Sequence, residues 1–299
     1  MLEWLEISPE LTVVATATRA FVHVPPGLGS DPFQAPMRGD GTPETTRWLL
    51  EGAIAIAGRA SAGQPASISA DADSKDSADL RAAHWAYRLA GYFHTTDATR
   101  RLLPLLARRF KECGRRTLAS WAEQKISEEA GHAQLALRDL SELGYRPQQL
   151  ARAFVPPRAA AWVTLFERLA AADDPVGCVG YAHALERLAL LRGPAEVQAI
   201  EQGLPAGVNA TRCLRVHSAL GSDTRHVHVN VATTAALLAD ERRAIAKACY
   251  LTARIYFDPA LDDDFHSARL AAKVLTFREP ARPSPLRSHD NPTTPTPIR

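Results

Sequence analysis

A glutamate and a histidine share the expected apolar face of one helix, where they could bind a metal ion. The stretch SEEAGHAQLALRDLSELGY, residues 127–145, has the apolar spacing of an amphipathic helix. On a helical wheel Glu129 and His132 fall on the same face as Leu118 and Leu140. A buried carboxylate must be paired or bound to a metal, because an isolated one is strongly destabilising. The pair therefore predicts a metal site, although an internal hydrogen bond or a tilt toward water would also explain it.

Further carboxylates and histidines follow along the chain. Glu186 is the sole acidic residue of the apolar stretch GYAHALERLALL, and VHSALGSDTRHVHV contains His217, Asp223 and His226. Asp223 and His226 repeat the carboxylate-x-x-histidine spacing of the first pair. Bridging carboxylates with a few neutral imidazoles suit two iron or manganese ions, and helical bundles that hold two irons use a closely similar supply. The joint pattern favours a metal centre of this kind.

Each residue also has an ordinary structural explanation. Glu186 could form a salt bridge with a neighbouring arginine such as Arg187. The stretch 217–226 could be a solvated loop in which Ser222 or Asp223 caps the following helix. We favour the metal because these residues occur together on separate helices of one expected bundle.

The periodicity of residues 77–277 predicts helices throughout and therefore an all-α bundle. We expect one helix from residue 77, a second that Asp97 caps and that ends at Cys113, and then the helix quoted above. That helix is expected to run unbroken to Gly144, a C′ residue. Further helices are expected in the stretches RAAAWVTLFERLAAA, PVGCVGYAHALERLALL, PAEVQAIEQGL, 210–255 and DDDFHSARLAAKVLTF.

The two ends of the chain differ from this helical part. Residues 1–76 are expected to form an irregular N-terminal arm with a possible strand at 11–24, a short helix at 44–57 and a polar loop. Residues 278–299 are rich in proline and poor in apolar residues, so we expect a disordered tail. The chain therefore divides into an arm, a helical domain and a tail.

Composition limits the class of protein. The 299 residues are 46% hydrophobic and 23% charged, which is typical of a globular protein, and the net charge of +2 is too small to indicate nucleic-acid binding. The four cysteines show no CxxC spacing, which favours free thiols in a reducing compartment. Neither a signal peptide nor a transmembrane run is visible. We expect a cytoplasmic protein that binds neither nucleic acid nor membrane.

Three stretches carry a resemblance to a known family: EEAGHAQLALRDLSELGY, GYAHALERLAL and RVHSALGSDTRHV. With them, residues 77–255 resemble the haem-oxygenase-like diiron oxidases, which are iron-containing redox enzymes. The resemblance implies a seven-helix bundle with two Fe(II)/Fe(III) ions, O₂ as cosubstrate and a small organic substrate. It also implies a homodimer and allows an external electron donor. The ligands that it implies are Glu129, His132, Glu186, His217, Asp223 and His226.

The sequence departs from the family pattern at two places. Many relatives have a histidine four residues before the aspartate, where this chain has Ala219, and His217 lies six residues before Asp223. On an unbroken helix His217 and His226 would point in opposite directions, so the chain must break near Gly221, or one of them is not a ligand. Some relatives have a glutamate seven residues before the first histidine, where this chain has Lys125. Lys125 could pair with Glu129, anchor an anionic substrate or extend to solvent, and we favour the last.

The function expected from this resemblance is an O₂-dependent diiron oxidase of specialised metabolism, such as natural-product biosynthesis, that carries out N-oxygenation, desaturation or oxidative decarboxylation. Lys125, Trp85, Tyr92 and Trp162 could line the substrate pocket, although the aromatic residues are equally explained as core.

Two other functions stay open. One is a metal-free enzyme similar to thiaminases or pyrroloquinoline-quinone synthases, and the thiaminase type would use Cys213 as a nucleophile. The other is a non-catalytic helical binding protein in which the metal-binding side chains are degenerate. Haem binding through His84 is disfavoured, since a carboxylate-rich core suits bare iron better than a porphyrin.

Overall fold

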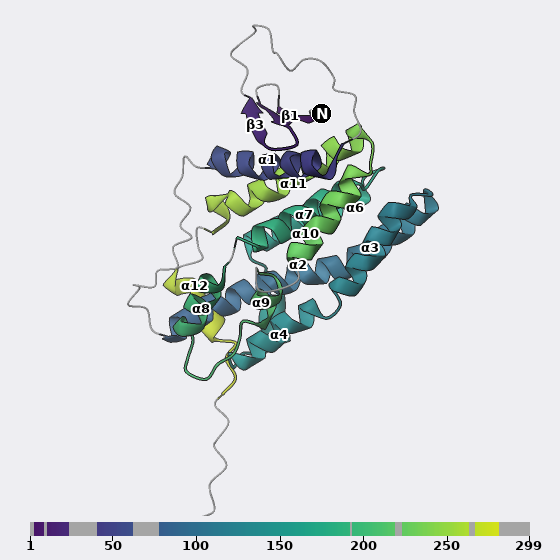
Figure 1. The fold of residues 1–299 in the computed structure, drawn as a ribbon. Helices are drawn as coiled ribbons and strands as arrows, with labels where there is room; N and C mark the ends of the chain where they lie inside the picture. The colour runs from purple at the N-terminus through teal and green to yellow at the C-terminus, as the bar shows by residue number, and fades with distance from the viewer. Residues whose placement is uncertain are drawn as a thin grey trace, which may run out of the picture.

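The computed structural model describes residues 3–8, 11–23, 41–61, 78–191, 193–218, 223–262 and 267–280. Helices make up most of this part of the chain, as Figure 1 shows, and the predicted all-α class is confirmed. The helices are α1 (Pro43–Ser61), α2 (Ala78–Glu112), α3 (Arg116–Glu128), α4 (His132–Glu142), α5 (Pro147–Ala153), α6 (Pro157–Ala171), α7 (Gly177–Ala189), α8 (Pro194–Gly203), α9 (Arg212–Val216), α10 (Asp223–Ala235), α11 (Ala239–Phe257) and α12 (Ala268–Leu275), with a 3₁₀ helix η1 (Pro259–Asp262).

The N-terminal segment is more regular than the sequence predicted. Strands β1 (Glu3–Ser8), β2 (Leu11–Ala15) and β3 (Ala20–His23) form a small antiparallel sheet in the order β1-β2-β3. The sheet lies against α1, which in turn packs on α11 (Figure 1). A Cβ atom added at Gly52 of α1 would lie 2.6 Å from Val13 Cγ1, so this helix and β2 are in close contact. Helix α1 therefore belongs to the folded body and is not a feature of a loose arm.

Two hydrophobic cores lie on either side of a boundary, and α2 spans both. The first core is built from α1, the C-terminal half of α2, α3, α6, α7, α10 and α11. The second core is built from the N-terminal half of α2, α4, α5, α8, α9 and α12. Leu89 of α2 is fully buried in the second core, and Leu106 is fully buried in the first. Helices α3 and α4, which are consecutive in the chain, thus pack into different cores.

The prediction that two helices meet at Asp97 is wrong, because α2 runs through this position without a break. The carboxylate of Asp97 accepts hydrogen bonds from Arg100 and Arg101 in the next turn. Ion pairs between residues three and four apart stabilise the interior of a helix. The Asp97 carboxylate is occupied by these two arginines and does not cap a new helix.

The prediction of one unbroken helix up to Gly144 is also wrong. Helix α3 ends at Glu128 and α4 begins at His132, with Gly131 between them at a φ of 87°. This left-handed conformation is accessible to glycine at little cost, and it redirects the chain from the first core to the second. Gly144 follows α4 with a φ of 78°, so its predicted position as the C′ residue is confirmed.

The folded part extends slightly beyond the predicted boundary at residue 277. Tyr145 and Arg278 form an isolated β-bridge, and the Arg278 guanidinium lies 2.7 Å from the Asp79 carboxylate. The remainder of the predicted tail, from residue 281 onward, lies outside the described residues. Within the described ranges, no helix combines the length and the apolar character needed to cross a membrane.

Candidate metal centre

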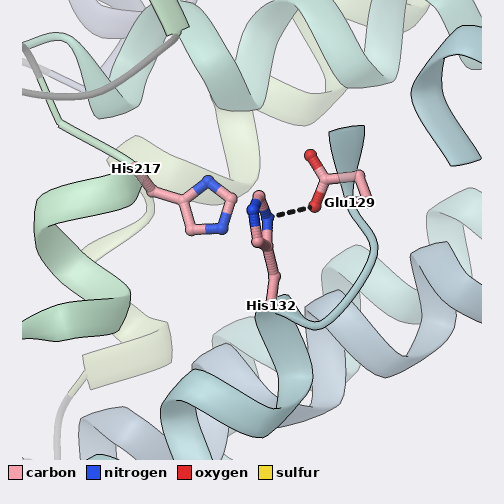
Figure 2. Close-up of side chains that lie close together, drawn as sticks. All are labelled: Glu129, His132 and His217. Atoms are coloured by element: carbon pink, nitrogen blue, oxygen red, sulfur yellow. Dashed lines mark hydrogen bonds and ion pairs between the residues drawn. The ribbon is translucent and has the colours of Figure 1, made fainter. Parts of the chain in front are cut away.

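Glu129, His132 and His217 converge on one point in the structure, as Figure 2 shows. Each offers one ligand atom, and these atoms all lie within 4.8 Å of one another. The carboxylate of Glu129 and Nδ1 of His132 are 2.9 Å apart and hydrogen-bonded. The His217 ring stands almost perpendicular to the His132 ring, with 4.6 Å between the ring centroids. We call these three residues the triad.

All three side chains come from helix ends. Glu129 is the C-cap residue of α3, His132 is the first residue of α4, and His217 is the C-cap residue of α9. Because α3 belongs to the first core while α4 and α9 belong to the second, the triad lies at the boundary between the two cores. The triad thus joins three helix ends, and the break at residues 129–131 does not separate Glu129 from His132.

The electrostatics of the triad favour binding of a cation. Burial alone would raise the pKa of Glu129, but the hydrogen bond from His132 and the charges of His217, His132 and Lys125 outweigh it and lower the pKa to about 2. Glu129 is therefore an anion at neutral pH. A largely buried anion beside two imidazoles can neutralise a positive ion without drawing in solvent.

The triad fits iron by its donors and its spacing. Two histidines and one carboxylate form the ligand set typical of non-haem Fe(II) oxygenases, in which the remaining coordination positions stay open. Two atoms bound to one such ion at about 2.1 Å each lie about 3 Å apart when they are at right angles, so ligand atoms within 4.8 Å of one another would need to approach by at most about 2 Å. The side chains therefore already lie near the arrangement that a single ion requires.

Asp139 ties the helix of His132 to the helix of His217. It is 0% exposed, and its Oδ2 accepts the backbone N–H of Cys213 at 2.9 Å. Its Oδ1 accepts a hydrogen bond from Arg212 at 3.1 Å. Asp139 lies two turns after His132 on the same face of α4. Sequence reasoning missed this residue, and its place on that face was the signal that could have revealed it.

A second group of charged residues lies beside the triad, around the ammonium of Lys125. The Lys125 Nζ atom lies 2.8 Å from Glu128 Oε2 and 2.7 Å from Glu186 Oε1. His226 Nε2 is 3.4 Å from the same Glu128 oxygen, and His226 Nδ1 is 3.9 Å from the same Glu186 oxygen. We call Lys125, Glu128, Glu186 and His226 the lysine cluster. The side chain of Lys125 is 2% exposed, so the expectation that it extends to solvent is wrong.

Further hydrogen bonds fix the carboxylates of the lysine cluster. Asn230 Nδ2 donates to Glu186 Oε2 at 2.6 Å, and Trp121 Nε1 donates to Asn230 Oδ1 at 2.8 Å. Gln124 donates to the second oxygen of Glu128. Sequence reasoning missed Glu128, which lies outside the apolar arc of the helical wheel, and Asn230, which lies one turn after His226 on α10.

The structure thus divides five of the six predicted ligands between two places. Glu129, His132 and His217 form the triad, while Glu186 and His226 belong to the lysine cluster. Asp223 begins α10, and its side chain lies outside the described part of the chain, as do residues 219–222. The alternative pairing of Glu186 with Arg187 is wrong, because Arg187 binds Glu51 at 2.5 Å.

The aromatic residues predicted for the substrate pocket have packing contacts of their own. Trp85 donates its indole N–H to Ala210 and packs edge-on against Tyr92 in the second core. Trp162 donates to the Thr252 carbonyl at 3.1 Å and packs against the first core. These contacts are those of core residues, and a role in substrate binding stays a prediction.

Comparison with known proteins agrees with the fold and with the chemistry of the triad. A solved structure from Shewanella denitrificans, described as a domain of unknown function with a haem oxygenase-like fold, is similar with a TM-score of 0.54 and 15% sequence identity. The similarity covers 76% of this chain and 90% of that chain, which confirms the predicted haem-oxygenase-like fold. No curated protein matches the sequence. The sequence profile of iron-containing redox enzymes matches residues 86–257, more than half of the chain. The chain therefore belongs to the family of iron-containing redox enzymes.

Proposed function

We propose that the protein is a non-haem iron oxidase that uses O₂ to oxidise a small organic substrate. The observation that carries this proposal is the triad, in which two histidines and one carboxylate meet at the boundary of the two cores. An iron ion bound there would supply the electrons for reduction of O₂, a chemistry that side chains alone do not provide. Family membership supports a redox enzyme, and the triad adds the place where its iron would bind.

The residues of the chain would hold and orient the reacting groups. Glu129 contributes a negative charge, and its hydrogen bond with His132 fixes the orientation of both side chains. Asp139 holds α9 against α4 and so keeps His217 opposite His132. Three protein ligands leave coordination positions for O₂ and for a substrate. The burial of His132, which is 9% exposed, limits access of bulk water to the centre.

The outcome of the reaction remains a proposal at the level of class. N-oxygenation, desaturation and oxidative decarboxylation, predicted from the family resemblance, all begin with oxidation of a small molecule near a non-haem iron. The homodimer and the external electron donor predicted from the resemblance also remain proposals.

The metal-free alternative finds less support. Cys213 is 0% exposed and packs in the second core among Leu214 and other apolar residues. A nucleophilic thiol must reach its substrate, and reactive cysteines lie in partly exposed, positively charged surroundings. The position of Cys213 is that of a packing residue.

An anaerobic Fe(II) titration tests the proposal. The chain is expected to bind iron tightly, and Glu129→Ala, His132→Ala and His217→Ala are expected to lose that binding and any O₂ consumption that depends on it. His228→Ala, which removes an exposed histidine from α10, is the matched control and is expected to bind iron as the parent does. Absence of specific iron from the folded chain, or unchanged binding in the triad variants, would refute the proposal.

A further inference from the structure

The lysine cluster has the donor atoms of a metal site and contains a side-chain ammonium. Glu128 ends α3, Glu186 lies on α7 and His226 on α10, so three helices direct two carboxylates and an imidazole to one buried point. Oxygen and imidazole ligands of this kind suit a divalent ion such as iron or manganese. The Lys125 Nζ atom lies between the two carboxylates, within 2.8 Å of each.

A lysine ammonium is well suited to replace an ion in such a position. It is a compact point charge that donates up to three hydrogen bonds, and here two of them go to carboxylate oxygens from different helices. Breaking this arrangement would leave two buried carboxylates without their positively charged partner, which is strongly unfavourable. The ammonium therefore holds Glu128 and Glu186 together, as a bridging metal ion would.

We infer that Lys125 takes the place of a second metal ion, so that the folded chain binds one iron, at the triad. The part of this inference that concerns the first iron rests on the proposed function. Lys125 lies one turn before Glu129, the C-cap residue of α3. The end of this helix thus provides the ammonium of the lysine cluster and the carboxylate of the triad. On this inference Glu186 is a partner of Lys125, His226 lies beside the two carboxylates that Lys125 binds, and neither is an iron ligand.

The charges around Lys125 support this assignment. Burial would lower the pKa of Lys125, but attraction and hydrogen bonds from Glu186 and Glu128 outweigh burial and raise it. The side chain thus stays protonated at neutral pH and cannot act as a neutral metal ligand.

Asn230 adds an independent geometric argument. Its amide donates to the oxygen of Glu186 that Lys125 does not contact, and Trp121 in turn fixes the orientation of Asn230. Both oxygens of Glu186 thus accept from protein donors, Lys125 and Asn230, through bonds of 2.7 Å and 2.6 Å. A carboxylate satisfied in this way at both oxygens would have to give up a charge-assisted bond before it could bind iron.

Metal counting under anaerobic conditions tests the inference without any measurement of activity. The metal-free chain is titrated with Fe(II), or with Co(II) as a coloured substitute, and bound metal per chain is determined by elemental analysis. We expect one ion in the parent chain, two in Lys125→Glu, and one in Lys247→Glu. Lys247 is an exposed lysine of α11, and its variant carries the same change of charge. The double variant Lys125→Glu, His132→Ala is expected to keep one ion, at the new site.

The result that two ions bind to the parent chain would overturn the inference and leave the proposed iron oxidase intact. A folded Lys125→Glu chain that binds no more metal than the parent would also overturn it. If the parent binds none and Lys125→Glu gains one, the inference stands and the proposed function fails. Should Lys125→Glu not fold, Glu186→Gln decides: the inference expects the parent's count of one ion, and a lower count refutes it.

Discussion

Removal of the Asp139 carboxylate should both destabilise the fold and weaken the triad. In Asp139→Ala the backbone N–H of Cys213, which is buried, loses its acceptor. An unsatisfied buried donor costs about 1–3 kcal/mol, and the lost bond to the partly exposed Arg212 adds up to about 1 kcal/mol. We therefore expect a decrease of about 3 kcal/mol in the free energy of unfolding.

The variant Asp139→Asn keeps a hydrogen-bond acceptor at this position and removes the negative charge of the carboxylate. Burial raises the pKa of Asp139, despite the hydrogen bonds from Cys213 and Arg212, so the negative charge itself contributes little to stability. The amide oxygen can still accept from Cys213, and we expect a loss of only about 1 kcal/mol. Glu142→Ala removes the other, more exposed carboxylate near Arg212 and is the matched control, with an expected loss below about 0.5 kcal/mol.

Urea unfolding followed by circular dichroism measures these differences, and Fe(II) titration of the same proteins measures their effect on the triad. Because Cys213 lies one turn before His217 on α9, Asp139→Ala should weaken Fe(II) binding about tenfold, which corresponds to about 1.4 kcal/mol. Glu142→Ala should leave it unchanged. If Asp139→Ala unfolds with the same free energy as Glu142→Ala, or binds Fe(II) as tightly, Asp139 does not position the triad.

Four other variants test the break at Gly131, the buried His183 and the role of Cys213. Gly131→Ala and Gly114→Ala both place a side chain at positive φ with no neighbour within 4 Å, so each should lose about 1–2 kcal/mol in urea unfolding. Only Gly131→Ala should also weaken Fe(II) binding, and equal effects on binding would contradict the importance of the break at residue 131. Burial lowers the pKa of His183 to about 3, and both ring nitrogens lack a hydrogen-bond partner among the described residues. Below its unfolded pKa of about 6.5 the unfolded chain takes up a proton that the folded chain refuses, so stability falls as the pH falls. The parent should lose about 2 kcal/mol more than His183→Leu between pH 7 and pH 5, and parallel pH profiles would argue against this. Cys213→Ala should keep Fe(II) binding and O₂ consumption, whereas loss of all activity with intact folding would favour the metal-free alternative.

Local pattern in the sequence was sufficient for the fold class and for the inward position of two residues of the triad. Apolar periodicity identified the helices from residue 77 onward, and it placed Glu129 and His132 on an inward face. The inward direction was right although the helix was not continuous, because both residues flank the break at Gly131. A glycine inside a helical pattern does not reveal whether it adopts positive φ, since that depends on the two cores on which α3 and α4 pack.

Partners distant in the sequence could not be predicted. Asp139 meets Cys213 and Lys125 meets Glu186 across more than sixty positions. Helical spacing indicates which face a side chain occupies, but not which other helix lies opposite that face. Lys125 shows this limit most clearly: a long side chain on an inward face can extend to water or turn inward, and only the positions of Glu128 and Glu186 decide between the two.

The placement of the triad at helix ends links metal binding to the packing of the whole molecule. Glu129 is attached to the first core through α3, while His132 and His217 are attached to the second through α4 and α9. An ion that binds all three residues therefore joins the two cores, and its binding free energy adds to the stability of their contact. Lys125 makes a comparable connection within the first core, where its ammonium joins α3 to α7. The difference is that the ammonium is covalently part of the chain and always present, whereas an ion at the triad would be exchangeable. If the proposed function and the inference about Lys125 both hold, open coordination positions would exist at the triad alone, and O₂ and substrate would meet there.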